Sequence, residues 1–401
     1  MNIACNDGNL YKIPRSSDRI VGIDIARIIA IFLALLSHAF GRVGLVFTSA
    51  AELAMRASTP LFLVLFGCMI TIVYIPRYNK ISFGYFTRIC WMRAGECYLW
   101  FLFNLFLLFL TGSQSLLYTI RSAFFMGSTA YVQILTLYTV YFLALPWLIA
   151  ALQKVGLVRA LAFAFLVHLA FVPIKALQIS DRVPGFAYIQ RIIDLAIGAG
   201  TQNMIAGPSI LHSLALVLGG VWVGRLIVDV LQTNRGLARL IAPFLAFAVV
   251  AAWSVTENSI VAVTGKTLSD LTLRNLNHPA YTMIYGALAV FVIPVLVLGL
   301  RSFKPREAAL VVGKRSLFVF GFGNAIISCW ANYYGSVILQ TLSAIMLLGT
   351  VIAVVYAYDI LLVRRFSSRP LDFLALIVQK MTRSIKDYLS IASDIIVRRY
   401  L

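Results

Sequence analysis

Long apolar segments dominate this chain and restrict what it can fold into. Of its 401 residues, 61% are hydrophobic and only 12% are charged, against about 45–50% and 25% in soluble domains. Within lipid, only helices and closed barrels satisfy their own backbone polar groups. Because the apolar runs are long and do not alternate with polar residues, they favour helices. We therefore expect an all-α, polytopic membrane helical bundle.

Ten segments are apolar enough to be predicted as transmembrane helices. They cover approximately residues 21–41, 58–76, 94–112, 131–151, 157–174, 208–227, 238–256, 280–300, 316–334 and 340–363. The more polar stretch 183–207 is interpreted as a long outer loop with an interfacial or re-entrant helix, with an eleventh span as the alternative. We expect a membrane domain over 1–363 and a basic cytoplasmic tail over 364–401, predicted as an amphipathic helix on the inner leaflet.

The distribution of lysine and arginine predicts the orientation, because cytoplasmic loops are enriched in them. With a cytoplasmic N-terminus, the inner segments hold 25 of the 34 basic residues, the outer segments hold 8, and Arg27 lies in the membrane. Both termini are therefore expected in the cytoplasm. The net charge of +19 follows from the same rule, so we expect membrane lipid and no nucleic acid as a partner. We therefore expect an integral, multispan membrane protein.

The first predicted span carries the polar residues that most narrow the function. Arg27 and His38 are separated by ten residues, so on a helix they share a face, roughly 16 Å apart along the axis. Asp24 lies on the same face and can pair with Arg27. A charged side chain at membrane depth costs about 3 kcal/mol and usually has a function. The alternative is a snorkelling arginine and a histidine hydrogen-bonded to a neighbouring helix.

This segment, GIDIARIIAIFLALLSHAF, resembles the first helix of the acyltransferase-3 family of integral membrane acyltransferases, where an arginine and a histidine have the same separation. Weaker similarities follow in order up to residue 363, in ASTPLFLVLFGCMI, FTRICWMRAGECYLW, VQILTLYTVYFLALPWLI, HSLALVLGGVWVGRLI and VVGKRSLFVFGFGNAI. MRAGECY and ILTLY look like the branch containing periplasmic glucan succinyltransferases. Two departures are the four residues between Arg88 and Arg93, where the family often has two, and Asn324, where it often has a histidine.

The resemblance implies transfer of an acetyl or succinyl group from cytoplasmic acyl-coenzyme A to a hydroxyl of a cell-envelope or exported glycan. Acetyl-CoA or succinyl-CoA is then a co-substrate, and no permanent cofactor or metal is expected. Arg27 is expected to contact the donor phosphates, whose geometry arginine matches; purely structural pairing with Asp24 is the alternative. His38 is expected to act as general base or to carry the acyl group as a nucleophile, and we favour the base. Asp24 is expected to orient Arg27 or to cap the helix.

The remaining candidates are assigned by position. Four basic residues at the predicted inner boundary are candidates for donor binding: Arg88, Arg93, Lys314 and Arg315. Plain positive-inside anchoring explains the first two equally well, and Arg93 can pair with Glu96. Three residues are candidates for lining the acceptor site or channel: Tyr138, His278 and Asn324. Packing is the ordinary role of an aromatic residue such as Tyr138.

Proteins of another class place charges in the membrane in the same way. A transporter or flippase of a small anion or lipid-linked sugar binds its substrate at mid-depth, although the sequence has no inverted repeat or broken helix pair. A non-catalytic scaffold leaves the Arg27–His38 pair unexplained. For the acyltransferase, we expect Arg27 and His38 to line one continuous channel open to the cytoplasm.

Overall fold

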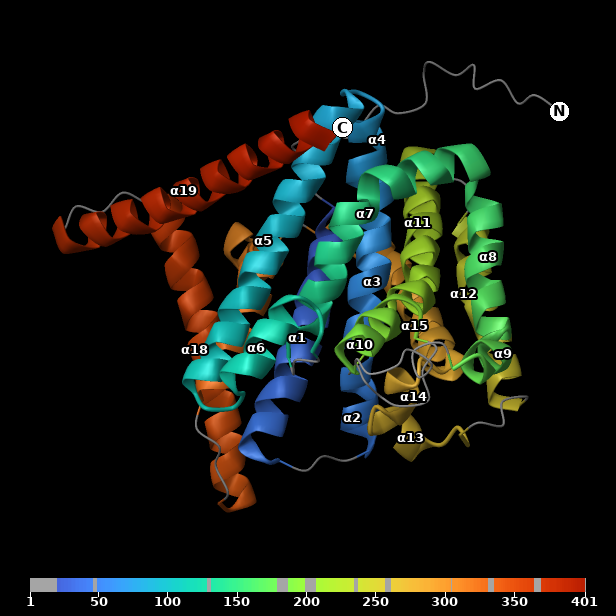
Figure 1. Ribbon diagram of the computed structural model, residues 1–401, viewed down its shortest axis with the longest axis horizontal. Coiled ribbons are helices and arrows are strands. Elements are labelled where there is room, and N and C mark those ends of the chain that lie inside the picture. The colour runs from blue at the N-terminus through green and yellow to red at the C-terminus, as the bar shows by residue number, and fades with distance from the viewer. Residues whose placement is uncertain are drawn as a thin grey trace.

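The computed structural model is a bundle of α-helices (Figure 1). It describes residues 20–45, 49–127, 131–178, 187–198, 207–233, 237–256, 261–303, 305–330, 335–363 and 369–400, and no strand occurs within these ranges. The helices of the first half are α1 (Val21–Val43), α2 (Ser49–Arg56), α3 (Ser58–Met69), α4 (Ile75–Tyr78), α5 (Phe83–Leu110), α6 (Leu116–Ala123), α7 (Gln133–Val155), α8 (Leu157–Leu169), α9 (Phe171–Ala176) and α10 (Ala187–Ala196). Those of the second half are α11 (Ile210–Thr233), α12 (Ile241–Thr256), α13 (Gly265–Ser269), α14 (Thr272–Asn275), α15 (Pro279–Gly299), α16 (Val311–Lys314), α17 (Ser316–Cys329), α18 (Val337–Val363) and α19 (Arg369–Tyr400).

Eight helices among the described residues are long and apolar enough to cross a membrane, so the chain is a multispan membrane protein and the predicted all-α fold is confirmed. They match eight of the ten predicted segments, and the two others correspond to the shorter apolar helices α8 and α17. Helix α10 falls in the stretch 183–207. Its 10 residues are too few for a span of about 20 residues, and most of the rest of that stretch lies outside the described residues.

Helix α3 lies in the middle of the bundle (Figure 1), because it is apolar on all sides. Every residue from Pro60 to Cys68 is buried, as expected for a helix without a polar face. A π-helical turn at Ile70–Tyr74 continues it into α4. Gly67 of α3 faces Gly220 of α11 so closely that a Cβ atom on Gly67 would lie 2.8 Å from the Gly220 Cα. The absence of a side chain is thus what lets the two backbones touch.

Helix α1 packs beside α3, α15 and α17 through a stripe of small residues. Ala26, Ala30 and Ala34 recur at every fourth position and are buried, which places them on one face. At the far end of the helix, Arg42 donates through Nε to the Trp330 carbonyl (2.8 Å) and through a terminal nitrogen to the Ser328 carbonyl (3.0 Å). A cation there stabilises the exposed carbonyls at the end of α17. These bonds fix α1 relative to α17.

Helix α19 confirms the helix predicted for the tail. It is 32 residues long and runs obliquely from the end of α18 past α5 (Figure 1). Arg88 of α5 forms an ion pair with Asp394 (Nε to Oδ1, 3.0 Å) and donates to the Ser390 hydroxyl. The side chains of Phe373 and Met381 are among its exposed apolar residues, in agreement with the amphipathic pattern of the sequence.

Candidate functional site

His38 of α1 is hydrogen-bonded to Asn324 of α17. The Nδ1–H of the imidazole donates to the Asn324 Oδ1 over 2.7 Å, and the asparagine is fully buried. Because an amide oxygen only accepts, Nδ1 carries the proton and Nε2 keeps its lone pair. Nε2 is thus the atom that can take a proton from a substrate. A histidine with a purely structural role would also bond to a neighbouring helix. The surroundings of the ring therefore have to distinguish a catalytic histidine from a structural one.

The surroundings are a cavity of about 350 Å³ with His38 in its wall, within the range of small-molecule sites. Helices α1, α2, α3, α7, α14 and α17 contribute to the wall. The polar and ionisable lining side chains are Ser37, His38, Glu52, Arg56, Ser58, Thr59, Tyr131, Gln133 and Arg274. An imidazole at the wall of such a polar cavity can contact a substrate, whereas an imidazole packed between helices cannot.

Aromatic rings hold the imidazole on two sides. The ring centroid of Tyr131 lies 4.9 Å from that of His38, and the centroid of Phe320 lies 6.5 Å away. The backbone of Tyr131 has φ 72°, a left-handed conformation that costs a non-glycine residue energy and is concentrated at functional sites. The phenolic hydroxyl of Tyr131 is protonated at neutral pH and can donate a hydrogen bond.

Arg56 and Arg274 line the same cavity, although neither was predicted from the sequence as a site residue. Arg56 donates from Nε to the Ser269 carbonyl (2.6 Å) and from a terminal nitrogen to the Ser37 hydroxyl (3.1 Å). Arg274 donates to the Gln133 Oε1 (2.8 Å). Arg56 lies just before the predicted span 58–76, and Arg274 lies a few residues before the span 280–300, both on the side that is poor in basic residues. A cation in such a position is the sequence signal that could have indicated them, but ordinary boundary charges have the same position.

At the other end of α1, Arg27 and Asp24 form the predicted pair, with 3.2 Å between the guanidinium nitrogen and Oδ1. Helix α16 packs against this end. A Cβ atom on Gly313 would lie 2.9 Å from the Asp24 carbonyl oxygen, so glycine permits the approach. Within the described residues, the lining of the His38 cavity does not include Arg27. The cavity at His38 and the Asp24–Arg27 pair therefore do not share one lining among the described residues, and the expected continuous channel stays a prediction.

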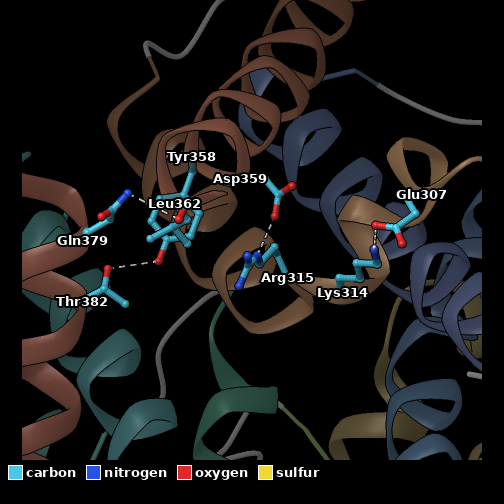
Figure 2. A network of polar contacts seen from close by, with 8 residues as sticks. All are labelled: Glu307, Lys314, Arg315, Tyr358, Asp359, Leu362, Gln379 and Thr382. Atoms are coloured by element: carbon cyan, nitrogen blue, oxygen red, sulfur yellow. Dashed lines mark hydrogen bonds and ion pairs between the residues drawn. The ribbon is translucent and has the colours of Figure 1, made fainter. Parts of the chain in front are cut away.

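Lys314 and Arg315 lie beside this end of α1, and both are ion-paired (Figure 2). The Lys314 Nζ is 2.8 Å from the Glu307 Oε2, and the Arg315 Nε is 2.8 Å from the Asp359 Oδ1. Glu307 is 92% exposed, so Lys314 can release this carboxylate and bind another anion at little cost in free energy. These two candidates thus share a neighbourhood with Asp24 and Arg27.

The two other basic candidates are on α5. Arg93 pairs with Glu96 over 2.6 Å, as the spacing predicted. Arg88 is bound to α19 through Asp394 and Ser390, which sequence reasoning did not foresee because 302 residues separate the partners. The observed contacts of Arg88 are those of a structural tie between the bundle and the tail.

We expect Arg88→Ala to loosen α19 while changing global stability little. The ion pair is partly exposed, and such pairs contribute about 0–1 kcal/mol. Limited proteolysis should cut α19 faster in Arg88→Ala and in Asp394→Ala, and Lys386→Ala, an exposed change on the same helix, should match the wild type. An unchanged cleavage rate with a higher KM for acyl-coenzyme A would instead support donor binding by Arg88.

Tyr138 and His278 do not line the cavity. The Tyr138 hydroxyl donates to the Phe62 carbonyl (2.8 Å), and its ring packs 5.2 Å from that of Phe66. His278 caps α15 by accepting the Ala280 N–H at Nδ1 (3.2 Å), and it is buried against Phe171. Burial lowers the pKa of His278 to about 4, so the ring is neutral at physiological pH. The observed contacts of both residues are structural.

No protein-family model matches the sequence, and a search of characterised proteins finds no match. Among the described residues, no group of three or more histidine, cysteine, aspartate or glutamate side chains is placed to hold a metal ion.

Proposed function

We propose that the protein is a membrane-bound O-acyltransferase that moves an acetyl or succinyl group from cytoplasmic acyl-coenzyme A to a hydroxyl of a cell-envelope or exported glycan. The observation that carries the proposal is the oriented imidazole: Asn324 holds the Nδ1 proton of His38 at the wall of a polar cavity. The resemblance of the first span to the acyltransferase-3 family supports the same reaction.

In this proposal, His38 is a general base. Its Nε2 takes the proton of the acceptor hydroxyl while the oxygen attacks the thioester carbonyl carbon. The tetrahedral intermediate then collapses, the carbon–sulfur bond breaks, and Nε2 returns the proton to the leaving thiolate. The products are a glycan ester and free coenzyme A. The Tyr131 hydroxyl, in the same wall, can donate to the developing oxyanion.

The donor phosphates are assigned to the opposite end of α1. Arg27 lies there. Gly313 of α16 approaches Asp24, which brings Lys314 and Arg315 to the same end. Three neighbouring cations suit a donor with several phosphates. Because the cavity does not extend to Arg27, a path for the acyl-bearing arm has to open during the cycle.

The proposed topology has ten spans, with α8 and α17 completing the eight longer helices. Both termini are then cytoplasmic and α19 lies on the inner leaflet of the bacterial inner membrane, as the excess of inner lysine and arginine supports. Arg27 is thereby placed on the donor side and His38 on the acceptor side.

An assay of purified protein with radiolabelled acetyl-CoA or succinyl-CoA and candidate glycans tests the proposal. We expect labelled glycan with the wild type, much less with Arg27→Ala through a higher KM for the donor, and a lower kcat with His38→Ala. Absence of transfer with every donor contradicts the proposal. Accumulation of unmodified substrate in vesicles indicates the transporter alternative.

Asn324 is expected to act by positioning His38. Removal of partners that orient metal-binding histidines typically costs about 10- to 100-fold in activity, and we expect a comparable fall in kcat for Asn324→Ala, with a shifted pH–rate profile. Asn104→Ala is the matched control, because Asn104 is also a buried amide and donates to the Gly321 carbonyl of the same helix (2.9 Å) without contacting His38. Equal kcat and pH profiles in the two variants would assign Asn324 a structural role alone.

A further inference from the structure

Two arginines share the cavity that contains His38. Arg56 is the last residue of α2, and Arg274 lies in α14. Figure 1 shows α2, α13 and α14 gathered at one end of the bundle. These short elements therefore bring two cations to the end of α1 where His38 lies.

Hydrogen bonds fix both guanidinium groups in position. Arg56 is held by the Ser269 carbonyl and the Ser37 hydroxyl, and Arg274 by the Gln133 side chain. The backbone of Arg56 is also fixed, because its carbonyl accepts the Tyr281 hydroxyl (3.0 Å). A guanidinium group has five N–H donors, so these bonds leave other donors of Arg56 for a ligand. The side chains are thus held in place before any ligand arrives.

The described part of the cavity lining is rich in positive charge. Among these residues, Glu52 supplies a carboxylate beside the two guanidinium groups of Arg56 and Arg274. Burial lowers the pKa of Arg274. The neighbouring Tyr281 opposes this shift, and the charge of Arg56 adds to it. Two cations in a partly desolvated space repel each other, and an anion between them would remove that cost.

The anion site is directly connected to the candidate base. Ser37, which accepts the Arg56 hydrogen bond, immediately precedes His38 on α1. A ligand that engages the arginines would therefore lie in the space into which the imidazole opens.

We infer that Arg56 and Arg274 form a binding site for a carboxylate or phosphate group of the substrate that reacts at His38. The inference rests on the proposed acyl transfer and deepens it. Planar guanidinium groups bind both kinds of anion through paired hydrogen bonds. The anion has two sources: the free carboxylate of a dicarboxylic acyl group on the donor, or an acidic substituent of the acceptor glycan.

Direct binding tests the site without relying on catalysis. Purified full-length protein is titrated calorimetrically with succinate, with inorganic phosphate and with neutral succinamide. We expect the wild type to bind at least one of the two anions and not succinamide, and Arg56→Gln and Arg274→Gln to bind that anion at least tenfold more weakly. Lys266→Gln removes an exposed cation of the neighbouring α13 and should bind as the wild type does. Equal binding in all variants, or equal affinity for succinamide, overturns the site.

Two further variants separate charge from folding and from chemistry. Arg56→Lys keeps the positive charge and should recover part of the affinity lost in Arg56→Gln. His38→Ala should still bind the anion, since the imidazole is not part of the anion site. A failure of the proposed acyl transfer would thus appear as absent transfer with intact anion binding, whereas a failure of the inference would appear as arginine-independent binding.

Kinetics then identify the source of the anion. Butyryl-CoA has the same chain length as succinyl-CoA and lacks the distal carboxylate. If the site binds the acyl group, Arg274→Gln should lower kcat/KM at least tenfold for succinyl-CoA and little for butyryl-CoA. If the site binds the acceptor, Arg274→Gln should lower kcat/KM for a phosphate-bearing glycan and not for an uncharged one. The loss should then be the same with both donors. A loss that is equal for charged and uncharged substrates overturns the inference.

Discussion

Replacing His38 by alanine is expected to lower kcat for acyl transfer by at least about 100-fold, since a positioned general base contributes about 10²- to 10⁴-fold. The fold should persist, because the lost contacts are one hydrogen bond to Asn324 and the ring contacts with Tyr131 and Phe320, and the imidazole adjoins a cavity that tolerates a smaller residue. Steady-state kinetics with saturating acyl-CoA, beside thermal unfolding of the same preparations, measure both effects.

His168→Ala is the matched control for this experiment. His168 is a fully buried histidine on α8 whose Nε2 lies 3.0 Å from the His212 carbonyl, and it does not line the cavity. We expect His168→Ala to affect stability and to leave kcat of the folded protein nearly unchanged. Similar kcat losses in both variants would show that His38 has no special role. Label that is bound covalently to His38 after rapid quenching and is released by hydroxylamine would favour the nucleophile over the base.

Replacing Gly67 by valine is expected to have the largest effect on folding. A Cβ atom at this position would overlap the Val217 carbonyl oxygen and approach the Gly220 backbone of α11. Overpacking costs about 1–3 kcal/mol where side chains can move, and here the obstacle is backbone, so we expect at least about 3 kcal/mol. Fluorescence-detected size exclusion after stepwise heating should show a much lower unfolding temperature or no folded protein.

Gly349→Val is the corresponding control. Gly349 lies in α18, and a Cβ atom there would meet nothing within 4 Å. Because glycine also weakens helices in water, this change should be neutral or slightly stabilising. If Gly67→Val and Gly349→Val had the same unfolding temperature, the close contact of α3 with α11 would be wrong.

Much of the fold could be predicted from the sequence because membrane spans are local features. Apolar length alone located the core of α3 and the whole of α15. The short helices were not predicted: α2, α13 and α14 have 8, 5 and 4 residues, too few for a periodic pattern. They are fixed by tertiary contacts such as the bond from Arg56 to the Ser269 carbonyl.

The candidate site was less accessible to sequence reasoning. Asp24 and Arg27 were predicted as a pair because helical spacing determines that contact. Asn324 was selected by position, but its bond to His38 joins residues 286 positions apart, which no local pattern encodes. Arg56 and Arg274 resemble ordinary boundary charges until the fold brings them into one cavity.

Side-resolved transfer in proteoliposomes tests the proposed acyl transfer most directly. Vesicles containing oriented wild-type protein receive radiolabelled acyl-CoA only on the side of α19, and the glycan is supplied only on the opposite side. We expect covalently labelled glycan to form on that opposite side and to fall at least about 100-fold with His38→Ala. Undiminished labelling with His38→Ala, or transport of label without any glycan ester, would contradict the proposed reaction.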